Sequence, residues 1–110
     1  MTRIPLSPAA SALLRSLIAR AGVPRDRILL TDIQSTDWQS LTFVGERHLL
    51  QLRVPGPESK QIVERMCADL EDAEFAICGQ IVADIALAAP PECAADGSTS
   101  VTFEALTVAE

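Results

Sequence analysis

The side chains able to do chemistry are few and widely spaced in this chain. His48 is the only histidine, and the three cysteines are Cys67, Cys78 and Cys93. A hydrolytic dyad or triad needs a base beside its nucleophile, and only His48 offers an imidazole. The cysteine spacing matches no compact zinc pattern, and the aspartates show no calcium-loop spacing. We therefore expect no catalytic residue, no metal and no cofactor. An enzyme that uses His48 or a pair of carboxylates ranks third among our hypotheses.

Four residues are candidates for contact with a ligand or a partner: Trp38, Arg47, His48 and Arg53. Trp38 is next to an expected turn at Asp37, where an indole either anchors an interface or covers the edge of the core. Arg47 and Arg53 share one face of an expected strand and are suited to holding an anion or an acidic segment. Such a segment occurs at the end of the second expected helix, at Asp69, Glu71, Asp72 and Glu74.

Charge argues against nucleic acid as the main partner. The net charge is −6, with +3 in residues 1–55 and −9 in residues 56–110. The expected order of the first elements is that of a double-stranded-RNA-binding domain, which needs a basic cluster where its second helix begins. Here residues 57–60 supply one lysine beside one glutamate. Because phosphate binding requires several cations, we expect no nucleic acid.

Cysteine usage and composition indicate a compartment and a source. An odd number of cysteines without a close pair argues against a disulfide framework and favours a cytoplasmic protein. Abundant alanine and a single lysine beside eight arginines favour a bacterial origin. No apolar run approaches the roughly 20 residues needed to cross a bilayer, so no membrane partner is expected.

Hydrophobic periodicity predicts the elements that must position these residues. A helix is predicted from Pro8 to Ala21, because Ser7 suits the N-cap and Gly22 the C-terminal end. A second helix is predicted over about 57–73, and strands over 27–36, 39–44, 47–54, 75–88 and 99–108. Gly45 and Glu46 are predicted to form a two-residue hairpin loop, with a glycine-centred bulge in one long strand as the alternative.

These elements predict a single α+β domain over residues 1–110. It is a two-layer sandwich in which two helices pack on one face of a mostly antiparallel sheet of four or five strands, in the order αβββαββ. The other sheet face, and an edge at the strand 75–88, then lack cover. We expect a non-enzymatic protein-interaction or structural module that forms a homodimer through its sheet or binds another protein. The alternative is a small-ligand-binding domain with a pocket between sheet and helices, which polar groups such as His48, Asp32 or Gln80 would line.

Overall fold

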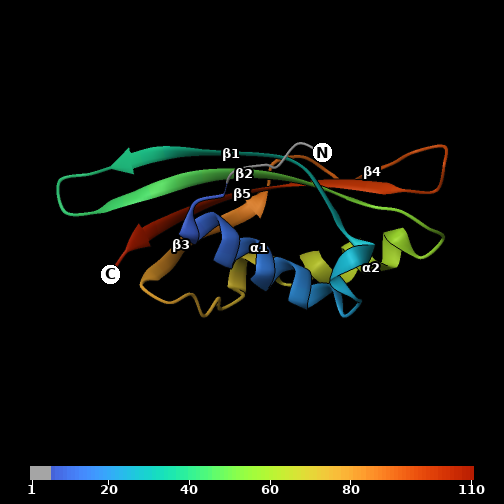
Figure 1. The fold of residues 1–110 in the computed structure, drawn as a ribbon, viewed down its shortest axis with the longest axis horizontal. Helices are drawn as coiled ribbons and strands as arrows, with labels where there is room; N and C mark the ends of the chain where they lie inside the picture. The colour runs from blue at the N-terminus through green and yellow to red at the C-terminus, as the bar shows by residue number, and fades with distance from the viewer. Residues whose placement is uncertain (1–5) are drawn as a thin grey trace.

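The structure, a computed structural model, describes residues 6–110 and has two layers (Figure 1). One layer is an antiparallel sheet of five strands, and both helices lie against the same face of that sheet. The predicted α+β sandwich is therefore confirmed. The helices are α1 (Pro8–Ala21) and α2 (Ser59–Cys67), with 3₁₀ turns η1 (Arg25–Arg27) and η2 (Leu70–Asp72). The strands are β1 (Leu29–Gln39), β2 (Val44–Val54), β3 (Gln80–Leu87), β4 (Glu92–Cys93) and β5 (Thr99–Ala109).

The strands are distributed differently from the prediction, in the order αββαβββ. The predicted hairpin at Gly45 and Glu46 is wrong, and so is the alternative bulge, because both residues lie in the unbroken register of β2. The chain turns at residues 40–43 instead, where the amide of Phe43 donates to the Ser40 hydroxyl over 3.1 Å. Gly45 is needed for close approach: a Cβ there would lie 1.9 Å from the carbonyl oxygen of Thr107.

The spatial order of the strands is β1-β2-β5-β3, with β4 added beside β5. One edge of the sheet is β1, and the other is shared by β3 and β4. The predicted strand 75–88 is shorter than expected, since β3 begins at Gln80 after a turn at Gly79. Its register shifts between Val82 and Asp84, so Ile81 and Ile85, which would share a face in a regular strand, lie on opposite faces. Ile85 is consequently buried, whereas Ile81 is half exposed.

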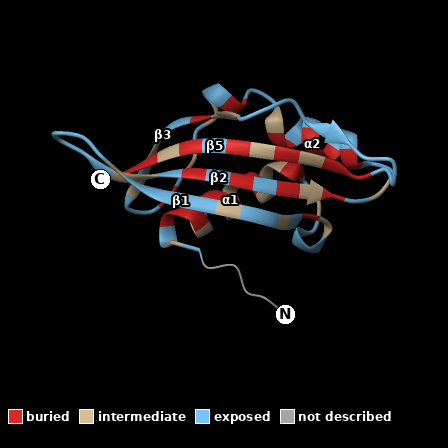
Figure 2. Cartoon of the chain, turned by 90° about the horizontal axis from the view of Figure 1, so that it is seen from above, coloured by how far each residue is buried: buried red, intermediate tan, exposed pale blue. Residues whose placement is uncertain are grey.

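The hydrophobic core lies between the sheet and the helices. The inward face of β2 carries His48, Leu50, Leu52 and Val54, as its alternation predicts, and all four are fully buried. Figure 2 shows buried residues alternating with exposed ones along β2 and mainly with intermediate ones along β5, while β1 is mostly exposed. The inward residues of β5 and the helices complete the core, chiefly Phe103, Leu13, Leu17, Ile62 and Met66.

The first helix has the predicted ends. The hydroxyl of Ser7 accepts a hydrogen bond from the amide of Ala10, and Gly22 adopts a left-handed conformation with φ 71°. The second helix is shorter than predicted, because it ends at Cys67 and Asp69 then turns the chain with φ 50°. The acidic residues expected at its C-terminal end therefore lie beyond that end, in and around η2.

Two arginines join the helices reciprocally at their C-terminal ends. The Arg20 side chain of α1 donates to the carbonyl of Met66 over 2.9 Å and also to that of Ala68. The Arg65 side chain of α2 donates to the carbonyl of Ala21 over 2.9 Å. Each helix thus supplies the cation that satisfies the last carbonyls of the other, where the helix dipole favours positive charge.

Candidate functional site

The four predicted contact residues do not converge on one site. All of them lie in β1 or β2, but His48 faces the helices, whereas Trp38, Arg47 and Arg53 belong to the positions that face away. Asp32, named with His48 as a ligand-binding group, is an exposed residue of β1. Arg47 and His48 both line a hollow of about 320 Å³, but the imidazole is fully buried on the side of the helices, so the four candidates do not form one site.

His48 is fully buried and satisfied by two hydroxyl groups. Its Nδ1 lies 2.7 Å from the Ser35 hydroxyl, and its Nε2 lies 2.8 Å from the Thr107 hydroxyl. Burial lowers the pKa of the imidazole, and the nearby charge of Glu46 opposes that shift. A catalytic base would need an oriented ring and access to substrate, and here the second nitrogen contacts a hydroxyl inside the protein. This arrangement is that of a structural histidine.

Arg47 and Arg53 lie on the sheet face that the helices do not cover. Each forms a salt bridge with an acidic residue. Arg47 lies 3.3 Å from Glu104, and both side chains are about half exposed. Arg53 pairs with Asp96 and donates to the Ser98 hydroxyl over 3.1 Å. Hydrogen bonds from Ser98 lower the pKa of Asp96, with a smaller contribution from Arg53. The partners of both arginines in this chain are thus Glu104 and Asp96, and not the acidic residues around η2.

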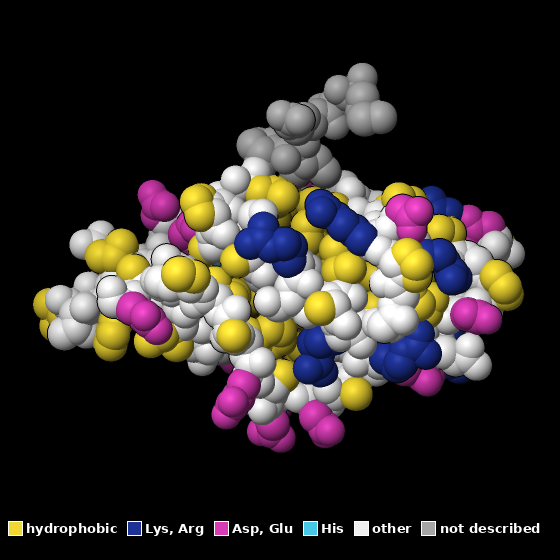
Figure 3. All heavy atoms as spheres, turned by 60° about the horizontal axis from the view of Figure 1, so that its bottom comes forward, with side chains coloured by type: hydrophobic (Ala, Val, Ile, Leu, Met, Phe, Trp, Pro, Cys, Tyr) yellow, Lys and Arg dark blue, Asp and Glu magenta, His cyan; other side chains and the backbone are white. Residues whose placement is uncertain are grey.

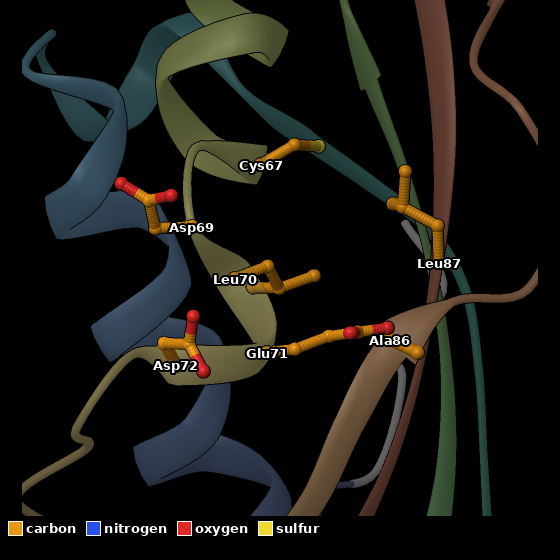
Figure 4. Close-up of a pocket in the computed structure, with 7 residues that line it drawn as sticks. All are labelled: Cys67, Asp69, Leu70, Glu71, Asp72, Ala86 and Leu87. Atoms are coloured by element: carbon orange, nitrogen blue, oxygen red, sulfur yellow. The ribbon is translucent and has the colours of Figure 1, made fainter.

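Three of those acidic residues, Asp69, Glu71 and Asp72, line a hollow of about 420 Å³ between η2 and β3 (Figure 4). Their side chains diverge, because Glu71 extends towards Ala86 whereas Asp69 and Asp72 lie on the side of α1. Among the described residues, no group of three or more His, Cys, Asp or Glu side chains is arranged to hold a metal ion. The hollow is open, and its carboxylates do not converge on one point.

The end of the β1–β2 hairpin exposes apolar side chains. Leu41 is fully exposed, and Phe43 and Val44 are 49% and 62% exposed. Figure 1 shows this hairpin projecting past the helices, and Figure 3 shows hydrophobic side chains gathered at that end of the molecule. Residues 40–43 are called the hairpin tip below. The tip was not predicted, because residues 39–44 were expected to form a strand, although a serine such as Ser40 can signal a turn.

An apolar groove lies at the opposite end of β1. It has a volume of about 840 Å³ and lies between α1, η1 and the start of β1. Leu29 and Leu6 on its walls are 47% and 37% exposed. Its other apolar walls come from Leu14, Ile18, Pro24, Ile28 and Leu30.

Between the tip and the groove runs an unprotected strand edge. The register of β1 is regular from Asp32 to Gln39, and β1 contains no lysine, arginine or proline, the residues that commonly guard edges. The opposite edge is interrupted by the irregularity in β3 and by Pro90 and Pro91 before β4. Between its own register shift at Leu30 and Asp32 and its end at Gln39, β1 therefore has the longest regular stretch of unpaired edge among the described strands.

Comparison with models of protein families, with curated proteins and with solved structures gives no match for this chain. No helix in the part of the chain that the structure describes has the length and apolar character needed to cross a bilayer.

Proposed function

We propose that this protein is a non-enzymatic interaction module that forms a homodimer by pairing β1 with β1 of a second copy. The observation that carries the proposal is the regular, unguarded edge from Asp32 to Gln39. An unpaired strand edge presents backbone donors and acceptors that a second strand can satisfy. A two-fold axis perpendicular to the sheet makes the two strands antiparallel and extends one sheet through both copies.

The charges along β1 are compatible with this pairing. Its only charged residues are Asp32 and Asp37. Asp32 lies two residues before Gln34, and Asp37 lies two residues after Ser35. In a register centred on Ser35, Asp32 lies opposite Trp38, and Asp37 lies opposite Ile33. In a register centred on Thr36, Asp37 lies opposite Ser35. Neither register places two like charges directly opposite each other, a contact that would destabilise the pair.

Composition supports a location for the module. Cys67, Cys78 and Cys93 are all free thiols, and two of them are exposed. Free exposed thiols are typical of proteins in a reducing compartment. We place the homodimer in the bacterial cytoplasm on this ground and on the arginine-rich, lysine-poor composition.

A small-ligand function gains no comparable support. The larger hollows along the described surface are open, and the groups proposed to line a ligand pocket do not meet. His48 already contacts Ser35 and Thr107, whereas Asp32 is exposed.

Charge complementation at the edge tests the proposal. One variant carries Gln34→Lys and Thr36→Lys, and a second carries Gln34→Glu and Thr36→Glu; both positions are exposed in β1. We expect the wild-type protein to sediment as a dimer at high micromolar concentration. Each variant alone should sediment as a monomer, because like charges then face each other across the axis. An equimolar mixture should restore the dimer.

Gln51→Lys is the matched control, since this exposed position lies one strand in from the edge. It should leave the dimer intact. A wild-type protein that stays monomeric at high micromolar concentration contradicts the proposal, and so does a mixture of the two variants that does not associate. Restoration by mixing also shows that both variants fold.

A further inference from the structure

We infer that, in this homodimer, the hairpin tip of each copy packs into the apolar groove beside Leu29 of the other copy. The inference rests on the proposed function, because it concerns the same edge. The inference adds two equivalent contacts between a tip and a groove, and these contacts fix the register in which the two β1 strands pair.

The first argument is position along β1. Leu29 and Leu41 are each six residues from Ser35, on opposite sides. At about 3.3 Å per residue, each leucine is at most roughly 20 Å from an axis at Ser35, because the register shift between Leu30 and Asp32 shortens one half and Leu41 lies in the turn just past Gln39. Antiparallel pairing about that axis therefore brings Leu41 of one copy to Leu29 of the second, and the two-fold symmetry makes this contact twice.

The second argument is the chemistry of the two surfaces. The tip, Ser40 to Phe43, carries no charge, and Leu41 is fully exposed at its end. The groove is walled mainly by leucine and isoleucine, with Arg25 and Asp26 also contributing to it. An uncharged apolar tip and an apolar groove gain from mutual burial, whereas each alone leaves hydrophobic surface in water.

The third argument is the size of the interface. Stable interfaces bury on the order of 1,200 Å² or more, with an apolar centre. The side chains along the β1 edge are mostly polar and exposed, such as Gln34, Ser35 and Thr36. Pairing along the β1 edge fixes the orientation of the two copies through backbone hydrogen bonds, but it buries little apolar area. Two tip-in-groove contacts supply the apolar area that the edge lacks.

Cross-linking between copies tests the inference. In a background with Cys67→Ala, Cys78→Ser and Cys93→Ser, one chain carries Leu41→Cys and another carries Leu29→Cys. A short bismaleimide should link the two chains when they are mixed. It should not link either variant to itself, because the two copies of position 41 are about 40 Å apart across the axis.

A second readout is the affinity of the dimer. Leu41→Ser removes two equivalent contacts and should raise the dimer Kd roughly 100-fold, by the transfer free energy of two leucine side chains. Thr42→Ala in the same tip is the matched control and should change the Kd little.

The outcomes separate the two claims. A background protein that never dimerises refutes the proposed function itself. A dimer that passes the charge-complementation test but gives no link between positions 41 and 29 overturns this inference alone. Self-linking of the Leu41→Cys chain also overturns it, because that result means that the tips pack against each other. A dimer Kd that Leu41→Ser leaves unchanged would also contradict the packing of the tip into the groove.

Discussion

The buried imidazole of His48 makes the stability of this fold depend on pH. In the unfolded chain the histidine titrates near 6.5, whereas burial lowers its pKa in the folded chain. Between these two pKa values the unfolded state binds a proton that the folded state does not. Stability is therefore fully present above about pH 6.5 and falls as the pH drops through that window.

This pH dependence is testable because His48 is the only histidine. Urea unfolding at about pH 7.5 and about pH 5.5 compares a pH above the ordinary histidine pKa with one below it, while most carboxylates stay ionised. We expect the wild-type protein to lose stability at the lower pH, and His48→Gln, which keeps polar atoms near Ser35 and Thr107, to lose clearly less. The same loss in both proteins would show that another group is responsible.

Some features of single residues could be predicted from the sequence, and others could not. The inward face of β2 from His48 to Val54 was predictable, because alternation with period two needs no tertiary information. Gly45 was misassigned, because its reason lies in another strand: the Thr107 carbonyl occupies the space that a side chain would need. A glycine required by close approach looks, in one sequence, like a glycine required by a turn.

At the scale of elements, the reciprocal arginines should contribute to stability. Arg20 donates to two carbonyls at the end of α2, and its guanidinium lies 5.9 Å from the centroid of the Phe75 ring. Arg20→Met should lower the free energy of unfolding by about 1–2 kcal/mol, through charge-assisted hydrogen bonds and the helix dipole. Chemical denaturation measures this change.

Arg15→Met in the same helix is the control. The hydrogen bond that the structure shows for the Arg15 side chain is an exposed one to the hydroxyl of Ser11. We expect a loss below about 0.5 kcal/mol there. Equal losses for the two variants would mean that the contacts of Arg20 with α2 contribute nothing measurable.

Element boundaries were predictable where local chemistry sets them. Ser7, Pro8 and Gly22 define α1 from the sequence, because capping is a local interaction. The end of α2 was not predictable, since Asp69 adopts a left-handed conformation that its residue type only weakly favours. The face reversal in β3 was equally hidden, because it depends on a register shift against β5.

At the scale of the whole molecule, both helices cover one sheet face and leave β1 as an open edge. An uncovered sheet face was predicted from the sequence, but the exposed edge was predicted at the strand 75–88. The structure adds β1, whose position at the edge follows from the pairing of β2 with β5 across a long separation in sequence. The hairpin tip and the groove at the two ends of β1 were likewise absent from the predicted site.

Amide hydrogen exchange at two protein concentrations tests the central claim most directly. On going from a concentration well below the dimer Kd to one well above it, alternate amides of residues 32–39 should exchange at least roughly 10-fold more slowly, because each then donates to the second copy. The amides of β3 should keep the same rates at both concentrations. Rates in β1 that do not change with association, or protection that arises in β3 instead, would contradict a dimer built on the β1 edge.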